Sequence, residues 1–483
     1  MTADNEAYFT STLQARCLDP IPYAVYFGTF AHTPELGSLE VHPRTAVGVD
    51  DKGVIRFIAK ECTENPLDLA ADFFGISRER IKLVDMTGFE TRFFFPGFID
   101  THIHAPQYPN NGIFGESTLL DWLNIYTFPL ESSLKDLAVA KEVYSRVVQK
   151  TLEYGTTTAA YYATIHTEAS KLLADTALRM GQRALVGKTC MNANSPNYYR
   201  ETLEESKRGT LDVIRYIEHR DPSGDLVKPI LTPRFAASCT EELLSWLGEL
   251  RKVKGYHCQT HLSENENEIK WMAELFPQYA NYTDIYYQND LLGPRTVLAH
   301  CIHLTDDEKD LLVETKSGVS HCPTSNSSIT SGEARVRWLL NSGINVSLGT
   351  DCSGGFSPSI LEVARHALLV SHHLVMSTHN DKEKLSVKEV LYLATVGGSK
   401  VLDMEDKVGT FAVGKKFDAQ LIDLCVRGSN IDIFDFQRPK WGFVERGQSE
   451  KRFGNLICKW LFNGDDRNVC RVYVNGRPVV YRE

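Results

Sequence analysis

The stretch FFFPGFIDTHIH, residues 93–104, is an apolar run that ends in alternating polar and apolar residues. A short, almost continuously apolar segment is typical of a strand buried on both faces of a parallel sheet. The end of the stretch places histidines at positions 102 and 104, and side chains two residues apart share one face of an extended chain. The stretch therefore predicts a buried strand that carries two imidazoles at its carboxyl end.

This pattern recurs along the chain. From Phe93 to about Asn380, short apolar segments alternate eight times with longer amphipathic ones. The short segments lie at 93–103, 156–163, 183–191, 228–237, 256–262, 295–302, 317–322 and 343–350. The clearest helix lies at 134–153, with Leu137, Ala140 and Tyr144 on one face and Ser133 as its expected cap. Eight strand–helix units predict a (β/α)8 barrel rather than an open sheet.

The segments on either side of the barrel have a different texture. Residues 20–92 are rich in turns and short alternating stretches, and β character returns after about Met404. We therefore expect residues 1–92 and 404–483 to join in a small β-sandwich domain beside a barrel formed by residues 93–403.

The composition limits the classes of partner. The net charge is −10 and the pI is near 5.9, so the surface would repel the phosphates of a nucleic acid. The first twenty residues lack the apolar core of a secretion signal, and no run is long enough to cross a bilayer, so no membrane partner is expected. Eleven cysteines without a C-x-x-C pair indicate reduced thiols in a cytoplasmic protein.

Further polar residues interrupt the apolar pattern where other predicted strands end. His261 and Glu264 follow the fifth segment, His300 ends the sixth, and Asp351 follows the eighth. Each alone has an ordinary explanation, such as a core histidine or a helix cap. Together they form a ring at the end of the barrel where active sites lie. Histidines with one aspartate suit a divalent cation such as zinc or iron, which lowers the pKa of a bound water and supplies hydroxide.

These motifs carry a family resemblance. PGFIDTHIH at 96–104, followed by the later elements in the same order, resembles the amidohydrolase superfamily. Within it, APQY at 105–108, LDWL at 120–123, PRF at 233–235 and HCPTSN at 321–326 resemble the guanine deaminases. The resemblance extends from about residue 20 to the C-terminus. It implies hydrolysis of guanine to xanthine and ammonia, one zinc or possible Fe²⁺ ion per chain, and a homodimer.

The resemblance also implies residue roles. The metal ligands would be His102, His104, His261 and Asp351, with His300 either ligating the metal or bonding to its water. The guanine pocket would include Gln107, Arg234, Phe235, His261 and Asp351. A bridging carboxylated lysine, expected after the fourth strand in binuclear relatives, is replaced here by PRF at 233–235, which favours one metal.

The chemistry of the residues supports these roles separately. Attack of water at purine carbon-2 requires proton delivery to a ring nitrogen, which Glu264 can perform. Asp351 and His300 can hold the hydroxide and stabilise the tetrahedral intermediate. Arg234 offers a fixed fork of donors to the guanine oxygen-6 edge, and Phe235 offers a ring for stacking.

Two alternatives remain open from the sequence. The enzyme could deaminate another amino-heterocycle, such as a modified purine, a pterin or a triazine. A catalytically silent barrel that serves as a scaffold is a second alternative, although all the expected ligands are present. The segment GTFAVGKK at 409–416 nearly matches a phosphate-binding loop, but it lacks the final Ser or Thr and precedes a strand, so we interpret it as a β turn.

Overall fold

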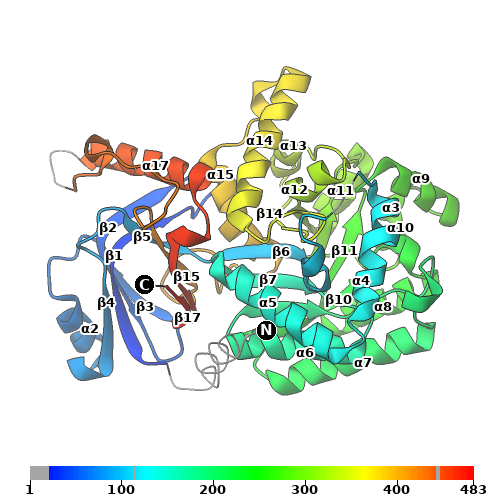
Figure 1. Cartoon of the computed structure of the whole chain (residues 1–483), viewed down its shortest axis with the longest axis horizontal. Coiled ribbons are helices and arrows are strands. Elements are labelled where there is room, and N and C mark those ends of the chain that lie inside the picture. Colours follow the sequence, from blue (N-terminus) through cyan, green and yellow to red (C-terminus); the bar gives the residue numbers. More distant parts are fainter. Residues whose placement is uncertain (1–20, 114–115, 442–445, 483) are drawn as a thin grey trace.

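Two sheets organise the chain, and they lie side by side in Figure 1. The structure is a computed structural model that describes residues 21–113, 116–441 and 446–482. The expectation about a secretion signal concerns residues outside this part of the chain. None of the described helices combines the length and apolar character needed to span a bilayer.

The larger sheet is the predicted barrel. Its eight main strands are parallel neighbours in chain order, and a short extra strand, β9, pairs with β10. The strands are β6 (Phe98–His104), β7 (Thr156–Tyr162), β8 (Arg183–Gly187), β9 (Thr189–Cys190), β10 (Val227–Pro233), β11 (His257–Leu262), β12 (Thr296–His300), β13 (Gly318–His321) and β14 (Val346–Leu348). The ring closes just beyond β14, where the Asp351 N–H donates to the His102 carbonyl (2.8 Å) and the His104 N–H to the Cys352 carbonyl (3.2 Å). The predicted fold class is confirmed.

Helices surround this barrel (Figure 1). They are α3 (Leu119–Trp122), α4 (Phe128–Ser133), α5 (Leu137–Glu153), α6 (Thr167–Met180), α7 (Leu203–Arg220), α8 (Glu241–Lys254), α9 (Glu266–Leu275), α10 (Tyr282–Gln288), α11 (Asp306–Thr315), α12 (Pro323–Ser328), α13 (Val336–Asn341), α14 (Ile360–Thr378), α15 (Val387–Tyr392) and α16 (Gly398–Val401).

The start of α5 differs from the prediction. Its cap is Asp136, whose carboxylate accepts from the Ala138 N–H (2.8 Å), whereas Ser133 ends the preceding helix α4. Leu137, expected on the buried face, is the first residue of the helix and is 47% exposed. Ala140 and Tyr144 are buried as predicted.

The smaller sheet joins the two ends of the chain. Its order is β17 (Arg477–Tyr481), β16 (Val469–Val474), β15 (Ala419–Asp423), β5 (Arg92–Pro96), β1 (Tyr23–His32), β2 (Glu40–Val49) and β3 (Ile55–Ala59), with β4 (Ile81–Asp85) paired to β1. The red C-terminal strands thus lie next to the blue N-terminal ones in Figure 1. We expected a sandwich, but hydrogen bonds connect all eight strands in one sheet.

The stretch FFFPGFIDTHIH, residues 93–104, divides between the two sheets. Arg92–Pro96 is β5, paired with β15 in the small sheet, and Phe98–His104 is β6, the first barrel strand. The predicted segment 93–103 therefore spans two strands, because an unbroken apolar run does not show where one sheet ends and the next begins. The GTFAVGKK segment lies in turns before β15, as predicted.

The terminal segments also contain two helices, α2 (Pro66–Phe74) and α17 (Arg446–Asn463), which the β-rich prediction missed. Helix α17 buries Phe453, Leu456, Ile457, Trp460 and Leu461, and this spacing is helical. The Trp460 ring stacks on Phe98 of β6 with centroids 5.8 Å apart. Helix α17 therefore secures the small sheet against the start of the barrel.

Candidate metal centre and active site

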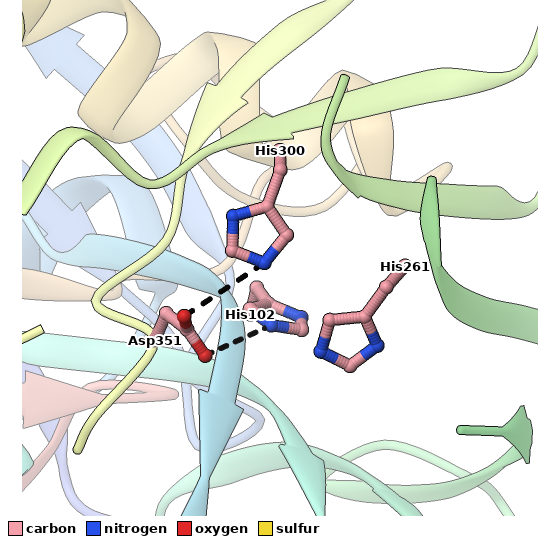
Figure 2. Close-up of side chains that lie close together, drawn as sticks. All are labelled: His102, His261, His300 and Asp351. Carbon is pink, nitrogen blue, oxygen red and sulfur yellow. Dashed lines mark ion pairs between the residues drawn. The ribbon is translucent and has the colours of Figure 1, made fainter. Parts of the chain in front are cut away.

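Four side chains converge at the carboxyl ends of the barrel strands (Figure 2). The imidazoles of His102, His261 and His300 and the carboxylate of Asp351 each offer a ligand atom, and these atoms lie within 4.8 Å of one another. We call this group the barrel cluster. Its members come from β6, β11, β12 and the residues after β14, which parallel strands bring to one edge.

Hydrogen bonds outside the barrel cluster orient two of its imidazoles. The Nδ1 of His261 lies 2.6 Å from the Arg234 carbonyl, and the Nδ1 of His300 lies 2.8 Å from Asn326 Oδ1. Both partners are oxygen acceptors, so each Nδ1 carries the hydrogen and each Nε2 keeps its lone pair. This arrangement is typical of histidines that bind a metal through Nε2.

The backbone at the strand ends is specialised for this convergence. His300 (φ 72°) and Asp351 (φ 44°) adopt the left-handed conformation, which is uncommon for residues other than glycine and turns their side chains into the ring. Gly349 lets β14 approach β6, because a Cβ there would lie 2.7 Å from His102 Cβ. The Asp100 carboxylate accepts from the backbone N–H groups of His102 and Thr350, both at 3.1 Å, and so ties the two strands together.

The polar atoms of the barrel cluster fit a metal ion. Both ring nitrogens of His102 and the Nε2 of His300 are buried without a hydrogen bond. The two Nε2 atoms face carboxylates instead, with His102 Nε2 3.1 Å from Asp351 Oδ1 and His300 Nε2 3.4 Å from Glu264 Oε2. Buried polar atoms are rarely left in this state without a ligand or ordered water. Burial lowers the pKa of His102 and of His261. Burial opposes ionisation of Asp351, but the imidazoles of His102, His300 and His104 outweigh it and hold the Asp351 pKa far below its usual value.

His104, the fifth predicted ligand, lies beside the barrel cluster. Its Nε2 is 3.2 Å from His261 Nε2 and 3.4 Å from Asp351 Oδ1. His104 is nevertheless not one of the four residues whose ligand atoms all lie within 4.8 Å of one another. Its Nδ1 is buried without a hydrogen-bond partner. The structure therefore brings His104 to the edge of the centre, and its role as a ligand stays a prediction.

Glu264 faces the same centre from the end of β11. Its Oε2 lies 3.4 Å from His300 Nε2, and its Oε1 accepts from the Ser331 hydroxyl at 3.4 Å. Burial, together with the charges of Asp351 and Glu268, raises the Glu264 pKa well above its usual value. A carboxyl group in such surroundings holds a proton more readily than one in water, which suits a group that moves protons.

A pocket opens beside the barrel cluster, and the predicted substrate residues line it. Gln107, Arg234, Phe235, His261 and Asp351 all contribute to its wall, as does Glu264. Apolar side chains form another part of the wall, namely Leu119, Trp122, Leu123 and Ile329. A pocket that combines apolar side chains with convergent polar groups suits a small aromatic ligand.

Sequence reasoning missed two buried acids of this site, namely Glu268, which lines the pocket, and Glu131. The Glu131 side chain is fully buried in α4 and contacts Gln107 and Arg234, both of which line the pocket. Nothing in the local sequence marked it, because α4 is short and its pattern has no motif. Asn326 belongs to the HCPTSN motif noted above, but its contact with His300 was not foreseen.

The comparison with family profiles supports the class that the fold and site define. Residues 93–479 match the profile of the amidohydrolase family. The chain therefore belongs to the amidohydrolase family, whose members are metal-dependent hydrolases.

Full-length relatives define the subgroup within that family. A probable guanine deaminase of Schizosaccharomyces pombe is 48% identical over 94% of this chain and 83% of its own length. The guanine deaminase of Homo sapiens is 41% identical over 94% of this chain and 96% of its own length. The crystal structure of the guanine deaminase of C. acetobutylicum with bound guanine has a TM-score of 0.81 and 31% identity, and covers 95% of this chain and 100% of that chain. The predicted family resemblance is confirmed.

Proposed function

We propose that this protein is a guanine deaminase that hydrolyses guanine to xanthine and ammonia. The observation that carries the proposal is the position of Arg234 and Gln107 in the wall of the pocket that His261, Glu264 and Asp351 also line. Specific hydrogen-bonding groups for a purine edge thus lie beside groups suited to a hydrolytic step. The names of the relatives agree with this assignment.

Each residue has a defined task in the proposed reaction. A divalent cation bound by His102, His261, His300 and Asp351, with His104 beside it, would ionise the attacking water. Glu264 takes a proton from that water and delivers it to a ring nitrogen, so that negative charge does not build up on the purine. Asp351 and His300 orient the nucleophile and stabilise the tetrahedral intermediate. The remaining proton of the attacking water, on the hydroxyl of the tetrahedral intermediate, then passes through Glu264 or Asp351 to the amine, which leaves as ammonia as the carbonyl forms.

The pocket side chains position the base. Arg234 donates to oxygen-6, Gln107 contacts the adjacent ring position, and the Phe235 ring packs against the purine. Arg234 also orients a metal ligand, because its carbonyl accepts the hydrogen bond from His261 Nδ1. The same residue thus contacts the base and positions a group that acts in the hydrolysis.

The finer properties follow from the resemblance and the chemistry of the donors. We propose zinc as the metal, because three imidazoles and one carboxylate match its preferred ligands, with Fe²⁺ as the alternative. We also propose a cytoplasmic homodimer. The cysteines of the described residues are all free thiols, which suits a reducing compartment. Light scattering on the purified protein measures the number of chains.

An amidohydrolase that acts on another amino-heterocycle is the second candidate. A triazine hydrolase shares the fold, with a TM-score of 0.78 but only 16% identity, so this likeness supports the fold alone. The direct test follows the ultraviolet spectrum of guanine on conversion to xanthine, with and without a chelator. Ammonia release from adenine, a pterin and a triazine separates the candidates, and turnover of one of these in place of guanine would overturn the proposal.

Replacement of Arg234 tests the pocket assignment. Arg234→Lys keeps a positive charge beside Glu131 but removes the planar donor fork. We expect the KM for guanine to rise by roughly 10-fold to 100-fold, the range expected when one bidentate charged contact is lost. The preference for guanine over adenine should fall with it. Steady-state kinetics with both bases measures this, with the melting temperature as a control for folding, and unchanged kinetics would refute the assignment.

A further inference from the structure

Glu131 lies behind the pocket wall and accepts three hydrogen bonds. Its Oε1 accepts from Gln107 Nε2 (2.8 Å), and its Oε2 accepts from an Arg234 nitrogen (2.8 Å) and from the Tyr199 hydroxyl (2.7 Å). The side chain is fully buried, and Arg234 and Gln107 are only 2% and 1% exposed. A π-helical turn at Leu123–Thr127 leads into the helix that carries Glu131, and such turns are frequent at functional sites.

The chemistry of a carboxylate fixes the direction of these bonds. An ionised carboxylate only accepts, so the Gln107 amide must turn its NH2 group towards Glu131. The Gln107 Oε1 is then on the other side, where it accepts from the Ser353 N–H at 3.3 Å. Without Glu131, the longer bond from the Ser353 N–H (3.3 Å) would be left to oppose an exchange of the two ends of the Gln107 amide. With Glu131, Gln107 presents an acceptor and Arg234 presents donors.

We propose that Glu131 is a positioning residue that sets the substrate selectivity of the pocket. By holding Gln107 and Arg234, it places a fixed hydrogen-bond acceptor beside fixed donors. This pair complements a lactam edge, in which a ring carbonyl lies next to a ring N–H, as at C6 and N1 of guanine. The amidine edge of adenine has the opposite order, an amino donor beside a ring acceptor. The inference rests on the proposed function and adds how the pocket distinguishes a 6-oxo from a 6-amino purine.

The simpler role for Glu131 is to neutralise the buried Arg234 charge. That role predicts a less stable protein when the carboxylate is lost, and an equal change in the affinity for every ligand. Selectivity predicts a change in the ratio of two affinities, which a uniform loss of structure does not produce. A measurement of the ratio of the two affinities therefore distinguishes the two roles.

The test uses binding of two purines that lack the 2-amino group of guanine. Hypoxanthine carries the lactam edge and adenine the amidine edge, and their dissociation constants are measured by calorimetry on the metal-loaded protein. We expect the wild type to favour hypoxanthine. In Glu131→Gln, the new amide can donate to Gln107 Oε1 and reverse that side chain, so the preference should fall at least about 10-fold, the equivalent of one well-placed hydrogen bond.

Tyr199→Phe is the matched variant. It removes one hydrogen bond from Glu131 but leaves the carboxylate, Gln107 and Arg234 in place, and Tyr199 is not among the residues that line the pocket. We expect its preference to fall about twofold to threefold, less than in Glu131→Gln, since only the least direct of the three bonds is lost. If Glu131→Gln is too unstable to purify, Tyr199→Phe tests the proposal in its place. An unchanged ratio of the hypoxanthine and adenine dissociation constants in Tyr199→Phe would then count against the proposal.

Two results decide the outcome. An unchanged hypoxanthine-to-adenine ratio in a folded Glu131→Gln variant overturns the role of Glu131, whatever its melting temperature. Wild-type protein that releases no ammonia from guanine overturns the proposed function instead, and the binding ratio still judges Glu131. In the active enzyme, we also expect Glu131→Gln to raise the KM for guanine more than it lowers kcat.

Discussion

Two clusters of potential metal ligands in this protein look alike in sequence and in spacing. The barrel cluster includes His102, the first histidine of H-x-H at 102–104, and a second group contains E-x-H at 40–42 with His32 on the paired strand. We call His32, Glu40 and His42 the hairpin cluster, because they lie on β1 and β2 of the small sheet. In both clusters the ligand atoms lie within 4.8 Å of one another.

Their surroundings differ. In the hairpin cluster, Glu40 Oε2 contacts His42 Nε2 at 2.8 Å and lies 3.8 Å from the Lys60 ammonium group. The Nδ1 of His32 bonds with the Thr410 hydroxyl. The Glu40 side chain is 42% exposed, against 9% for Asp351. The hairpin cluster therefore satisfies its own polar groups and already has a cation beside its carboxylate. The barrel cluster instead buries imidazole nitrogens that make no hydrogen bond and face carboxylates.

This contrast teaches that nearness of ligand atoms is not sufficient for a metal site. A site for a cation also needs lone pairs that no other group occupies and burial that makes them costly to leave unpaired. We therefore expect one metal ion per chain, held by the barrel cluster.

The largest effect should come from loss of the carboxylate in the barrel cluster. In Asp351→Asn the amide cannot neutralise a divalent cation, so we expect bound metal to fall from about one equivalent per chain to near zero, and guanine turnover with it. Elemental analysis of the purified variant measures the metal. The matched control is Glu40→Gln in the hairpin cluster, which should keep both. Equal metal loss in the two variants would contradict the distinction.

A second variant separates metal binding from proton transfer. Glu264→Gln keeps the shape of the side chain but removes its ability to move a proton. We expect kcat to fall roughly 1,000-fold, within the range for loss of a general acid–base group, while metal content stays at the wild-type level. Near wild-type turnover would remove Glu264 from the mechanism.

The hairpin cluster should instead make the free energy of unfolding depend on pH, through His32. Burial lowers the His32 pKa to about 4, from its usual value near 6.5. The unfolded chain therefore takes up a proton at pH values where folded His32 stays neutral, and the free energy of unfolding decreases as the pH falls from about 6.5 to 4. Above pH 6.5 this contribution to the pH dependence vanishes.

We expect His32→Gln to weaken that dependence by about 1–3 kcal/mol between pH 7 and pH 4, because glutamine does not titrate. Urea unfolding at several pH values measures it, with the difference between variant and wild type as the quantity of interest. A constant difference across this range would show that His32 keeps its usual pKa in the folded protein.

The smallest effect should come from His42. His42→Ala removes one contact to a partly exposed carboxylate that still faces Lys60, so we expect less than about 1 kcal/mol in the free energy of unfolding. Metal content and kcat should not change. Urea unfolding at pH 7 and elemental analysis check both, and a lost metal equivalent would identify the hairpin cluster as a second site.

Part of the fold and site was predictable because it depends on local pattern. The eight apolar segments appeared as barrel strands, since burial on both faces requires apolar residues regardless of what surrounds them. The division of 93–103 between β5 and β6 was not predictable, because both sheets demand the same kind of residue. Helix α17 had a readable signal in the spacing of Phe453, Ile457 and Trp460, but the β stretches on either side of it dominated the interpretation.

The candidate site shows the same division. H-x-H in a strand fixes two imidazoles on one face, and PRF at a strand end brings Arg234 to the rim. Neither pattern reveals the left-handed backbone of His300, which depends on contacts between neighbouring strands. Glu131 gave no signal because its role is defined by Gln107 and Arg234, residues 24 and 103 positions away.

The sequence by itself determined the kind of barrel, the ligand types and the edge at which they gather, because periodicity and strand polarity are local consequences of side-chain chemistry. Only the tertiary structure decided which polar atoms remain unpaired, that His104 lies beside the barrel cluster, and that one buried carboxylate orients the pocket wall. These features depend on distances between segments that are far apart in the chain, and hydrogen-bond satisfaction is a property of the folded surroundings rather than of any single segment.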